Sequence, residues 1–382
     1  MSRTLPPLSV GALLAVGTAM APAMADVPRV AADIAPVHSL VARVMDGVGE
    51  PALVIPPGAS PHEYSLRPSE AAALQEADLV FWVGHDLTPW LESAVETLAE
   101  GAEVTTLLEV DEVNLLDFRE GALFEAHAHG DDDHGDHGHG DEAGHDDHDD
   151  HAHAEEAAAD GDEHGDHDHD HDHAEEAADD HDHDHDHAEE AADDHDHDEE
   201  HAAHDDHAGH DHGEHDPHAW LSPDNAAVWL NVIAAKLSAA DPENAGAYFA
   251  NAAAGRAEID ALKGEIDATL APVRGGNFIV FHDAYQYFET AFDIPAAGAI
   301  SLGDAADPSP ARIAEIQARV RDEGIDCVLA EPQYNPAMVT TVLDGTEAGT
   351  GVLDPLGSDL EIGQALYPQL LRNLADALAD CL

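Results

Sequence analysis

The chain has 382 residues, of which 82 are acidic and 13 are Lys or Arg, so its formal net charge is −69. This excess of negative charge repels nucleic-acid phosphates and anionic lipid, and it disfavours both as partners. The same charge attracts cations, which directs attention to metal ions.

The first 25 residues are predicted to be a secretory signal peptide. Arg3 supplies the positive end, residues 8–16 form a short apolar stretch, and Ala-Met-Ala at 23–25 has the small-x-small pattern of a cleavage site. The apolar stretch is too short to span a bilayer. The mature protein is therefore expected to begin near Asp26 and to be periplasmic and not membrane-embedded.

Residues 26–126 are predicted to form the first part of an N-terminal α/β domain. Short apolar runs predict strands at 27–32, 52–55 and 79–83, and helix-like segments lie at 37–45 and 68–75. In the second of these segments, Ser69 is a candidate helix cap and Glu70 suits the positive end of the helix dipole. Strands that alternate with helices predict a parallel sheet.

Residues 127–215 form a run that holds 26 of the 31 histidines and 38 of the 82 acidic residues. The run has almost no apolar side chain larger than Ala, so it cannot bury a core, and we predict a disordered loop. Imidazole and carboxylate groups at this density predict weak, exchanging sites for divalent metals. The accessory candidates are His134, His137, His139, His169, His171, His173, His181, His183, His185 and His187.

The chain after the run is predicted to complete the first domain and to build a second one. Residues 216–240 form the remainder of the N-terminal domain, with a helix capped by Asp224. Residues 241–272 form a long linking helix that begins at Asp241-Pro242-Glu243. Residues 273–382 form a C-terminal α/β domain. Its expected strands are 277–281, 327–330 and 351–353, and its expected helices are 283–292, 310–323 and 364–382.

Polar residues that follow the apolar runs are the candidates for a binding site, because ligands gather at the carboxyl ends of strands in open α/β sheets. These candidates are His62, His218, His282, Glu331 and Asp354. For Glu331 a supporting role is favoured over metal contact. Three histidines suit one metal between the domains, since three imidazoles on Zn²⁺ leave a fourth tetrahedral position open for exchange.

Other chemistry-bearing residues have structural explanations. His38 is expected at the surface or as a helix cap, and His85 is expected to be structural. Cys327 and Cys381 are the only cysteines, and in an oxidising compartment two cysteines pair more often than they bind metal.

Five motifs resemble the periplasmic zinc-binding receptors of high-affinity zinc ABC importers, a branch of the metal-binding solute-receptor family. They occupy residues 58–64, 216–223, 281–288, 330–333 and 353–357. The resemblance implies two α/β domains with parallel-type sheets, joined by a long rigid helix, with the metal in the interdomain cleft.

The resemblance also implies the ligands. It places zinc on His62, His218 and His282, while Asp354 matches a carboxylate ligand of manganese-binding relatives. The fourth position is left to Asp354, to Glu63 or to water. Relatives that bind manganese carry Glu where His282 stands, and His favours zinc by ligand softness. Cys327 and Cys381 match a disulfide of the zinc branch.

The leading functional hypothesis is a monomeric binding protein, not an enzyme, that captures Zn²⁺ and delivers it to an inner-membrane ABC permease with its ATPase. The alternatives are a receptor for manganese or another divalent metal, a metal-storage or buffering protein that works through the run, and a zinc hydrolase with three histidine ligands.

Overall fold

The computed structural model describes residues 27–119, 124, 215–301 and 308–382. The predicted signal peptide and the ten accessory histidines lie outside the described residues, as does the 127–215 run except for His215. Both sheets that the structure describes belong to one compact unit of the chain. The domain boundaries at 240/241 and 272/273 therefore stay predictions.

Strands and helices alternate along the described chain, except that two consecutive α-helices, at residues 223–240 and 245–270, separate the strands of the first sheet from those of the second. The strands are β1 (Val30–Ala32), β2 (Ala52–Leu53), β3 (Leu79–Trp82), β4 (Glu103–Thr106), β5 (Phe278–His282), β6 (Gly298–Ser301), β7 (Cys327–Ala330) and β8 (Gly349–Val352). The α-helices are α1 (Ala35–Val44), α2 (Pro68–Glu76), α3 (Pro89–Leu98), α4 (Pro223–Ala240), α5 (Ala245–Leu270), α6 (Gln286–Phe292), α7 (Pro310–Asp322), α8 (Pro336–Leu343) and α9 (Leu366–Cys381).

The strands form two four-stranded parallel sheets, in the orders β2-β1-β3-β4 and β6-β5-β7-β8. The parallel-sheet prediction is therefore confirmed. Strands β1 and β3 are buried along their whole length, which explains why they read as continuous apolar runs. The central strands of the second sheet show the two-residue period of a pleated strand instead: Phe278 and Val280 join the main core, while Ile279 and Phe281 join a second cluster.

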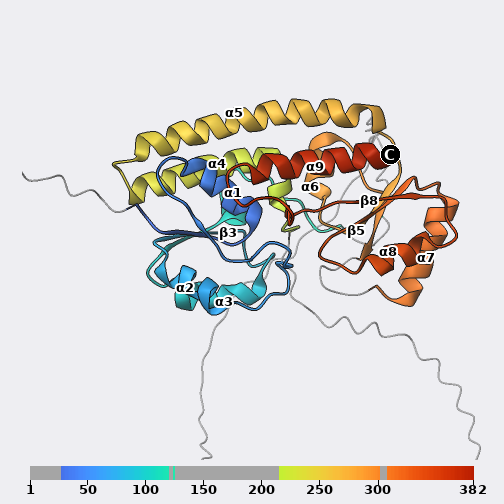
Figure 1. Cartoon of the computed structure of the whole chain (residues 1–382), viewed down its shortest axis with the longest axis horizontal. Helices are drawn as coiled ribbons and strands as arrows, with labels where there is room; N and C mark the ends of the chain where they lie inside the picture. The colour runs from blue at the N-terminus through green and yellow to red at the C-terminus, as the bar shows by residue number, and fades with distance from the viewer. Residues whose placement is uncertain (1–26, 120–123, 125–214, 302–307) are drawn as a thin grey trace, which may run out of the picture. The chain divides into compact units, whose positions relative to one another are not determined.

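The long helix α5 packs against helices from both halves of the described chain. It contacts α1 and α4, which pack on strands of the first sheet, and it contacts α9, which packs on β8 of the second. Figure 1 shows α5 running beside α4 and α9. Its 26 residues correspond to about 39 Å at the usual rise. Such a helix ties the two sheets to a common support, as the long linking helix was predicted to do.

Two predicted helix caps and one predicted helix start are wrong. Ser222, not Asp224, caps α4 by accepting from the backbone N–H of Asn225. Helix α5 begins at Ala245 because Asp241 instead accepts from Asn244 and Tyr248 across a turn. Ser69 does not cap α2. In its place Glu70 reaches back to the backbone N–H of Arg67 at 2.7 Å.

Four elements have sequence signals too weak to be predicted. Strand β4 is an edge strand in which Glu103 and Val104 are exposed, and β6 contains Gly298 and Ala299, which are poor strand formers. Helix α8 contains several β-branched residues, and α3 is a short helix that opens on Pro89. Each is stabilised by packing on its neighbours, which local sequence does not express.

Cys327 on β7 and Cys381 at the end of α9 form a disulfide across 54 residues of chain. The pairing implied by the sequence is therefore present. In the chain-entropy description a loop of that size adds about 4 kcal/mol to stability. The bond fastens the C-terminal helix to the second sheet, whose edge strand β8 lies beneath the same helix.

Within the part of the chain that the structure describes, no helix combines the length and the apolarity needed to cross a bilayer.

Asp33, directly after β1, is a buried carboxylate that links the ends of two strands. Its Oδ1 accepts from the N–H of Ile34 and its Oδ2 from the N–H of Val83, both at 2.7 Å. Burial raises the pKa of Asp33 to about 7, and the donating amides only partly oppose that shift. The group is therefore protonated in the folded chain over a range in which an unfolded chain ionises it.

This difference predicts a pH-dependent contribution to stability. Between about pH 4 and pH 7 the folded chain holds a proton on Asp33 that the unfolded chain releases, so the contribution of Asp33 should fall as pH rises. We expect the unfolding free energy of the wild type, relative to Asp33→Asn, to drop by up to about 4 kcal/mol over this range and then to level off. Urea unfolding of both proteins at several pH values measures this, and a constant difference would contradict it.

Candidate metal centre

His218 is held in place by Asp216, two residues earlier in the sequence. It lies directly before the 3₁₀ turn η2 (Ala219–Leu221) and is 1% exposed. Asp216 Oδ1 accepts from the His218 backbone N–H at 2.9 Å and from its ring Nδ1 at 2.7 Å. Because the carboxylate accepts the Nδ1 proton, the lone pair of the neutral ring lies on Nε2.

His282 is held in the same way by a residue from a neighbouring strand. It is the last residue of β5 and is 3% exposed. Glu331 directly follows β7, and its Oε1 accepts from the His282 backbone N–H at 3.1 Å and from ring Nδ1 at 2.7 Å. Strands β5 and β7 are adjacent and parallel, so their carboxyl ends bring the pair together across 49 residues.

His62 comes from the loop after β2 and is half-buried. The indole N–H of Trp90 donates to the carbonyl of Pro61 at 2.7 Å, which fastens the loop to α3. Tyr64 donates to the Glu70 carboxylate at 2.9 Å, which fastens it to α2. These bonds give a Gly- and Pro-rich loop a defined path on both sides of the imidazole.

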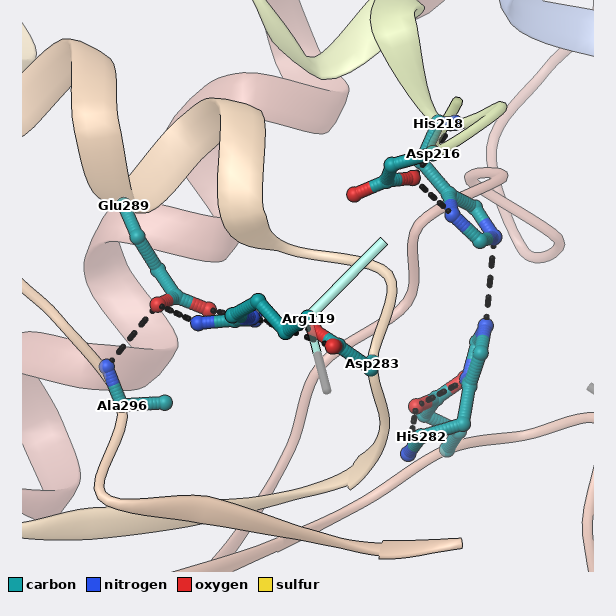
Figure 2. Close-up of polar contacts among 8 residues, drawn as sticks. Arg119, Asp216, His218, His282, Asp283, Glu289 and Ala296 are labelled. Carbon is teal, nitrogen blue, oxygen red and sulfur yellow. Dashed lines mark hydrogen bonds and ion pairs between the residues drawn. The ribbon is translucent and has the colours of Figure 1, made fainter. Parts of the chain in front are cut away.

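The three imidazoles converge. His62, His218 and His282 each offer a ring nitrogen, and these atoms lie within 4.8 Å of one another. The Nε2 atoms of His218 and His282 are 3.4 Å apart, and Figure 2 shows the two rings pointing at each other. Two nitrogens bound tetrahedrally to Zn²⁺ at 2.0–2.1 Å would be about 3.3 Å apart. The buried pair therefore already has the spacing that one tetrahedral ion requires.

The surroundings of the three rings are largely apolar. The pocket around them is lined by Ser60, Pro61, His62, His218, Trp220, His282, Glu331, Gln333, Tyr334, Pro355 and Leu356. Tyr334 stacks on Phe281 with ring centroids 4.4 Å apart, and the Trp220 indole N–H donates to the carbonyl of Pro355 at 2.8 Å. Such walls lower the local dielectric, which strengthens a cation's attraction to its ligands.

The two carboxylate candidates for the fourth position do not join this group. The Oδ1 of Asp354 accepts from Gln333 Nε2 and from the Leu356 N–H, each at 3.0 Å. Its Oδ2 accepts from the Ser358 N–H. Glu63 is exposed beside His62. In the described part of the chain the group that could hold a metal ion therefore comprises the three histidines.

The other histidines have structural partners, as expected, although one lies elsewhere than expected. His85 is partly exposed and pairs with Glu92 at 3.0 Å. His38 was predicted at the surface or as a cap and is instead 6% exposed within α1. Its Nε2 bonds the carbonyl of Pro51 at 3.0 Å. The prediction failed because α1 packs against β1, β2 and three helices, which leaves little of its surface in water.

Asp216, which contacts the candidate ligand His218, was not singled out by the sequence analysis. Its signal was present, since it precedes His218 by two residues with Pro217 between them. An acidic residue that close to a ligand is a candidate to orient the imidazole. Glu331 was assigned a supporting role, and its contact with His282 fits that role.

The site is suited to hold a divalent ion reversibly. Neutral imidazoles are borderline-soft ligands suited to Zn²⁺ and its neighbours, and two carboxylates behind them raise ring basicity. Three ligands leave one tetrahedral position for an exchanging group. Binding requires deprotonated rings, so it must release protons or fail in acid.

Comparisons with known proteins agree with this description. The family model described as "ZnuA: Zinc-uptake complex component A periplasmic" matches residues 30–381. A "High-affinity zinc uptake system protein ZnuA" of Brucella abortus (strain 2308) is 43% identical over 353 residues, covering 92% of this chain and 91% of the relative. The protein of the same name from Paracoccus denitrificans is 42% identical over 377 residues, covering 98% of each.

Solved structures show the same fold at lower identity. One described as "Crystal structure of ZnuA" superimposes with a TM-score of 0.62 at 18% identity and covers 93% of this chain and 99% of that one. A structure of "the SBP FpvC from pseudomonas aeruginosa in complex with Mn2+" gives 0.61 at 16% identity, covering 93% and 97%. At these identities the likeness concerns architecture, and metal choice rests on this chain's residues.

The carboxylates behind the rings can be tested separately from the rings. Asp216→Asn and Glu331→Gln keep the side-chain shape but remove the charge that orients and polarises the imidazole. We expect each to weaken Zn²⁺ binding by about 10- to 100-fold, measured by competition with a chromophoric chelator. Asp241→Asn, a buried carboxylate bonded to Asn244 and Tyr248, is the matched control and should bind as the wild type does. Wild-type affinity in both test variants would refute the role.

Proposed function

The chain belongs to the family of periplasmic zinc-uptake complex component A, and from that premise we propose that it captures Zn²⁺ and passes it to an ABC-type zinc import permease. The family match spans residues 30–381, which include every described element of both sheets. Curated relatives at 42–43% identity carry the name of a high-affinity zinc uptake system protein.

One observation carries the proposal: three histidines from three separate segments offer nitrogens within 4.8 Å of one another. His62, His218 and His282 are proposed as the zinc ligands. Carboxylates hold the two buried rings with Nε2 toward the centre. Such an arrangement has no structural purpose as a core, because buried imidazoles facing one another contribute less than apolar packing would.

Zinc is proposed over manganese because of the donor set. Three imidazoles suit Zn²⁺, whereas Mn²⁺ favours carboxylate and carbonyl oxygens. The residue that resembles a manganese ligand, Asp354, is engaged by Gln333 and by two backbone amides. A carboxylate at the centre would favour manganese, and the described group offers three imidazoles instead.

Water is the proposed occupant of the fourth position, with Asp354 and Glu63 as the alternatives. Asp354 would have to give up its bonds to Gln333 and the following turn. Glu63 would have to turn in from an exposed site. A water molecule needs neither change and leaves a position that a permease ligand can take during transfer.

The proposal assigns binding and release, and no catalytic step, to this chain. Residues 1–25 are proposed as the export signal and the mature chain as a periplasmic monomer. Its proposed partner is an inner-membrane permease whose ATPase supplies the energy.

Removal of any one ligand should abolish tight binding. We expect calorimetry of the wild type to give one tight Zn²⁺ site and His62→Ala, His218→Ala and His282→Ala to weaken it by more than about 100-fold, because fewer than three imidazoles remain. His85→Ala is the control, since His85 pairs with Glu92 instead. If the wild type has no tight 1:1 site, or if the three variants retain it, the proposed function is wrong.

The 127–215 run is proposed as an accessory store of weak zinc sites. Its 26 histidines lie outside the described residues except His215, so this proposal rests on composition alone. Exchanging sites near His218 would raise the local concentration of metal that can reach the centre.

Deletion of residues 128–208 separates the contribution of the accessory sites from that of the centre. Total bound zinc at saturation should fall toward one ion per chain, because all ten accessory candidates are removed, while the affinity of the tight site stays unchanged. Equilibrium dialysis with elemental analysis measures the stoichiometry. Equal stoichiometry of the intact and deleted proteins would exclude binding by the run.

A further inference from the structure

Arg119 lies in a buried ion-pair cluster next to the metal centre, and the proposed function does not use it. Its Nε donates to Asp283 Oδ1 and Oδ2 at 2.9 and 3.0 Å, and its Nη1 and Nη2 donate to Glu289 Oε2 and Oε1 at 2.7 and 3.0 Å. The three side chains are 17%, 10% and 5% exposed. Figure 2 shows the guanidinium between the two carboxylates.

The carboxylates of this cluster hold Arg119 in place and keep its guanidinium charged. Burial opposes the charge of Arg119, but the two carboxylates outweigh it and hold the pKa of Arg119 above its ordinary value. Glu289 Oε2 also accepts from the backbone N–H of Ala296 at 3.0 Å, and the guanidinium lies 3.6 Å from the Phe124 ring centroid. A planar guanidinium with bonds to two carboxylates tolerates little displacement.

A second set of bonds joins the two described segments on either side of the 127–215 run. The Asp216 N–H donates to the carbonyl of Leu116 at 2.8 Å, and Asp117 forms an antiparallel bridge with His215. Tyr287, on α6, donates its hydroxyl to the carbonyl of Asp216 at 2.9 Å and accepts from the Leu116 N–H at 3.0 Å. Residues 116–119 and 215–218 are therefore joined to each other and to α6.

Together these bonds link the chain segments on which the two buried histidines, His218 and His282, lie. On one side Arg119 holds Asp283, which is covalently next to His282. On the other side the segment of Arg119 holds the backbone of Asp216, whose carboxylate orients His218. These contacts therefore connect the two backbone segments that carry His218 and His282, whose Nε2 atoms are 3.4 Å apart. A metal site needs its ligands placed to within about 0.5 Å.

We propose that Arg119 is a positioning residue of the metal centre, which sets the separation of His218 and His282 by clamping Asp283 and Glu289 to the segment that leads to Asp216. It touches no metal itself. The proposal rests on the proposed function, since it concerns the same three-histidine site. It predicts that the geometry of the bound ion, and not only the stability of the fold, depends on this guanidinium.

The main test is Arg119→Lys in the full-length chain, which keeps the positive charge but loses the planar fork. Arg43→Lys is the matched control: Arg43 is 15% exposed and makes a two-bond pair with Glu258, away from the centre. We expect Arg119→Lys to release Zn²⁺ to excess chelator about 10-fold faster and to shift the visible absorption of bound Co²⁺. Arg43→Lys should match the wild type in both.

A second variant guards against simple unfolding. Arg119→Met alone leaves two buried carboxylates unpaired and is expected to be unstable, so the triple change Arg119→Met, Asp283→Asn and Glu289→Gln removes the whole charge cluster. It should fold, as circular dichroism and thermal unfolding would verify, and still show fast Zn²⁺ release and an altered Co²⁺ spectrum. Should Arg119→Lys fail to fold, this variant decides the question.

The outcomes separate the two proposals. If the wild type binds zinc tightly and both Arg119 variants release it and absorb as the wild type does, the positioning role is overturned and the proposed function stands. If Arg119→Lys differs only as much as Arg43→Lys, a general loss of stability is the explanation and the positioning role is again overturned. If the wild type itself lacks a tight site, the proposed function fails first.

Discussion

The centre depends on one interaction, made twice: a carboxylate that accepts the Nδ1 proton of a buried imidazole. Asp216 does this for His218 and Glu331 for His282, each at 2.7 Å. Each carboxylate oxygen also accepts the backbone N–H of the same histidine, so ring and main chain are fixed together. The bond selects the tautomer, directs Nε2 inward and supplies negative charge behind the ligand. Without it, two facing imidazoles would be an expensive feature of a core.

The fold brings the partners of these carboxylate–imidazole contacts together from different elements. Parallel strands end at a common edge, so β5 delivers His282 and β7 delivers Glu331 to neighbouring points. The Glu–His pair is thus a consequence of strand order. The Asp–His pair is local, separated by a single proline. His62 belongs to the first sheet and arrives on a loop fixed by Trp90 and Tyr64. Helix α5 supports elements of both sheets and keeps these separate sources in one frame.

The carboxylates fall into two groups, exposed and buried. Most of the acidic residues in the described ranges lie at the surface, where water solvates them and single ion pairs contribute little. A few are buried, and each of those has a defined partner: Asp283 and Glu289 on Arg119, Asp216 and Glu331 on histidines. Burial makes the second group costly unless it is paired. Two of these pairs, Asp216–His218 and Glu331–His282, lie at the candidate centre. The buried carboxylates Asp33 and Asp241 have structural partners instead.

The amino-acid sequence was sufficient to predict the fold class, the alternation of strands and helices, the three histidines that the structure brings together, and the pairing of the cysteines. The fold class and the alternation follow from apolar runs, and the count of two cysteines favours their pairing. Polar residues directly after strands include five candidates, and the resemblance of five motifs to a known family selects the three histidines among them. The sequence did not determine that Asp354 bonds Gln333 and a backbone turn instead of joining the centre, nor that Ser222 caps α4. Those outcomes depend on which of several polar atoms lies within about 3 Å. The tertiary structure alone decided that Arg119 lies between Asp283 and Glu289, residues more than 160 positions away. No local pattern encodes such a contact, because it arises only when distant segments pack and a buried charge must find its partners.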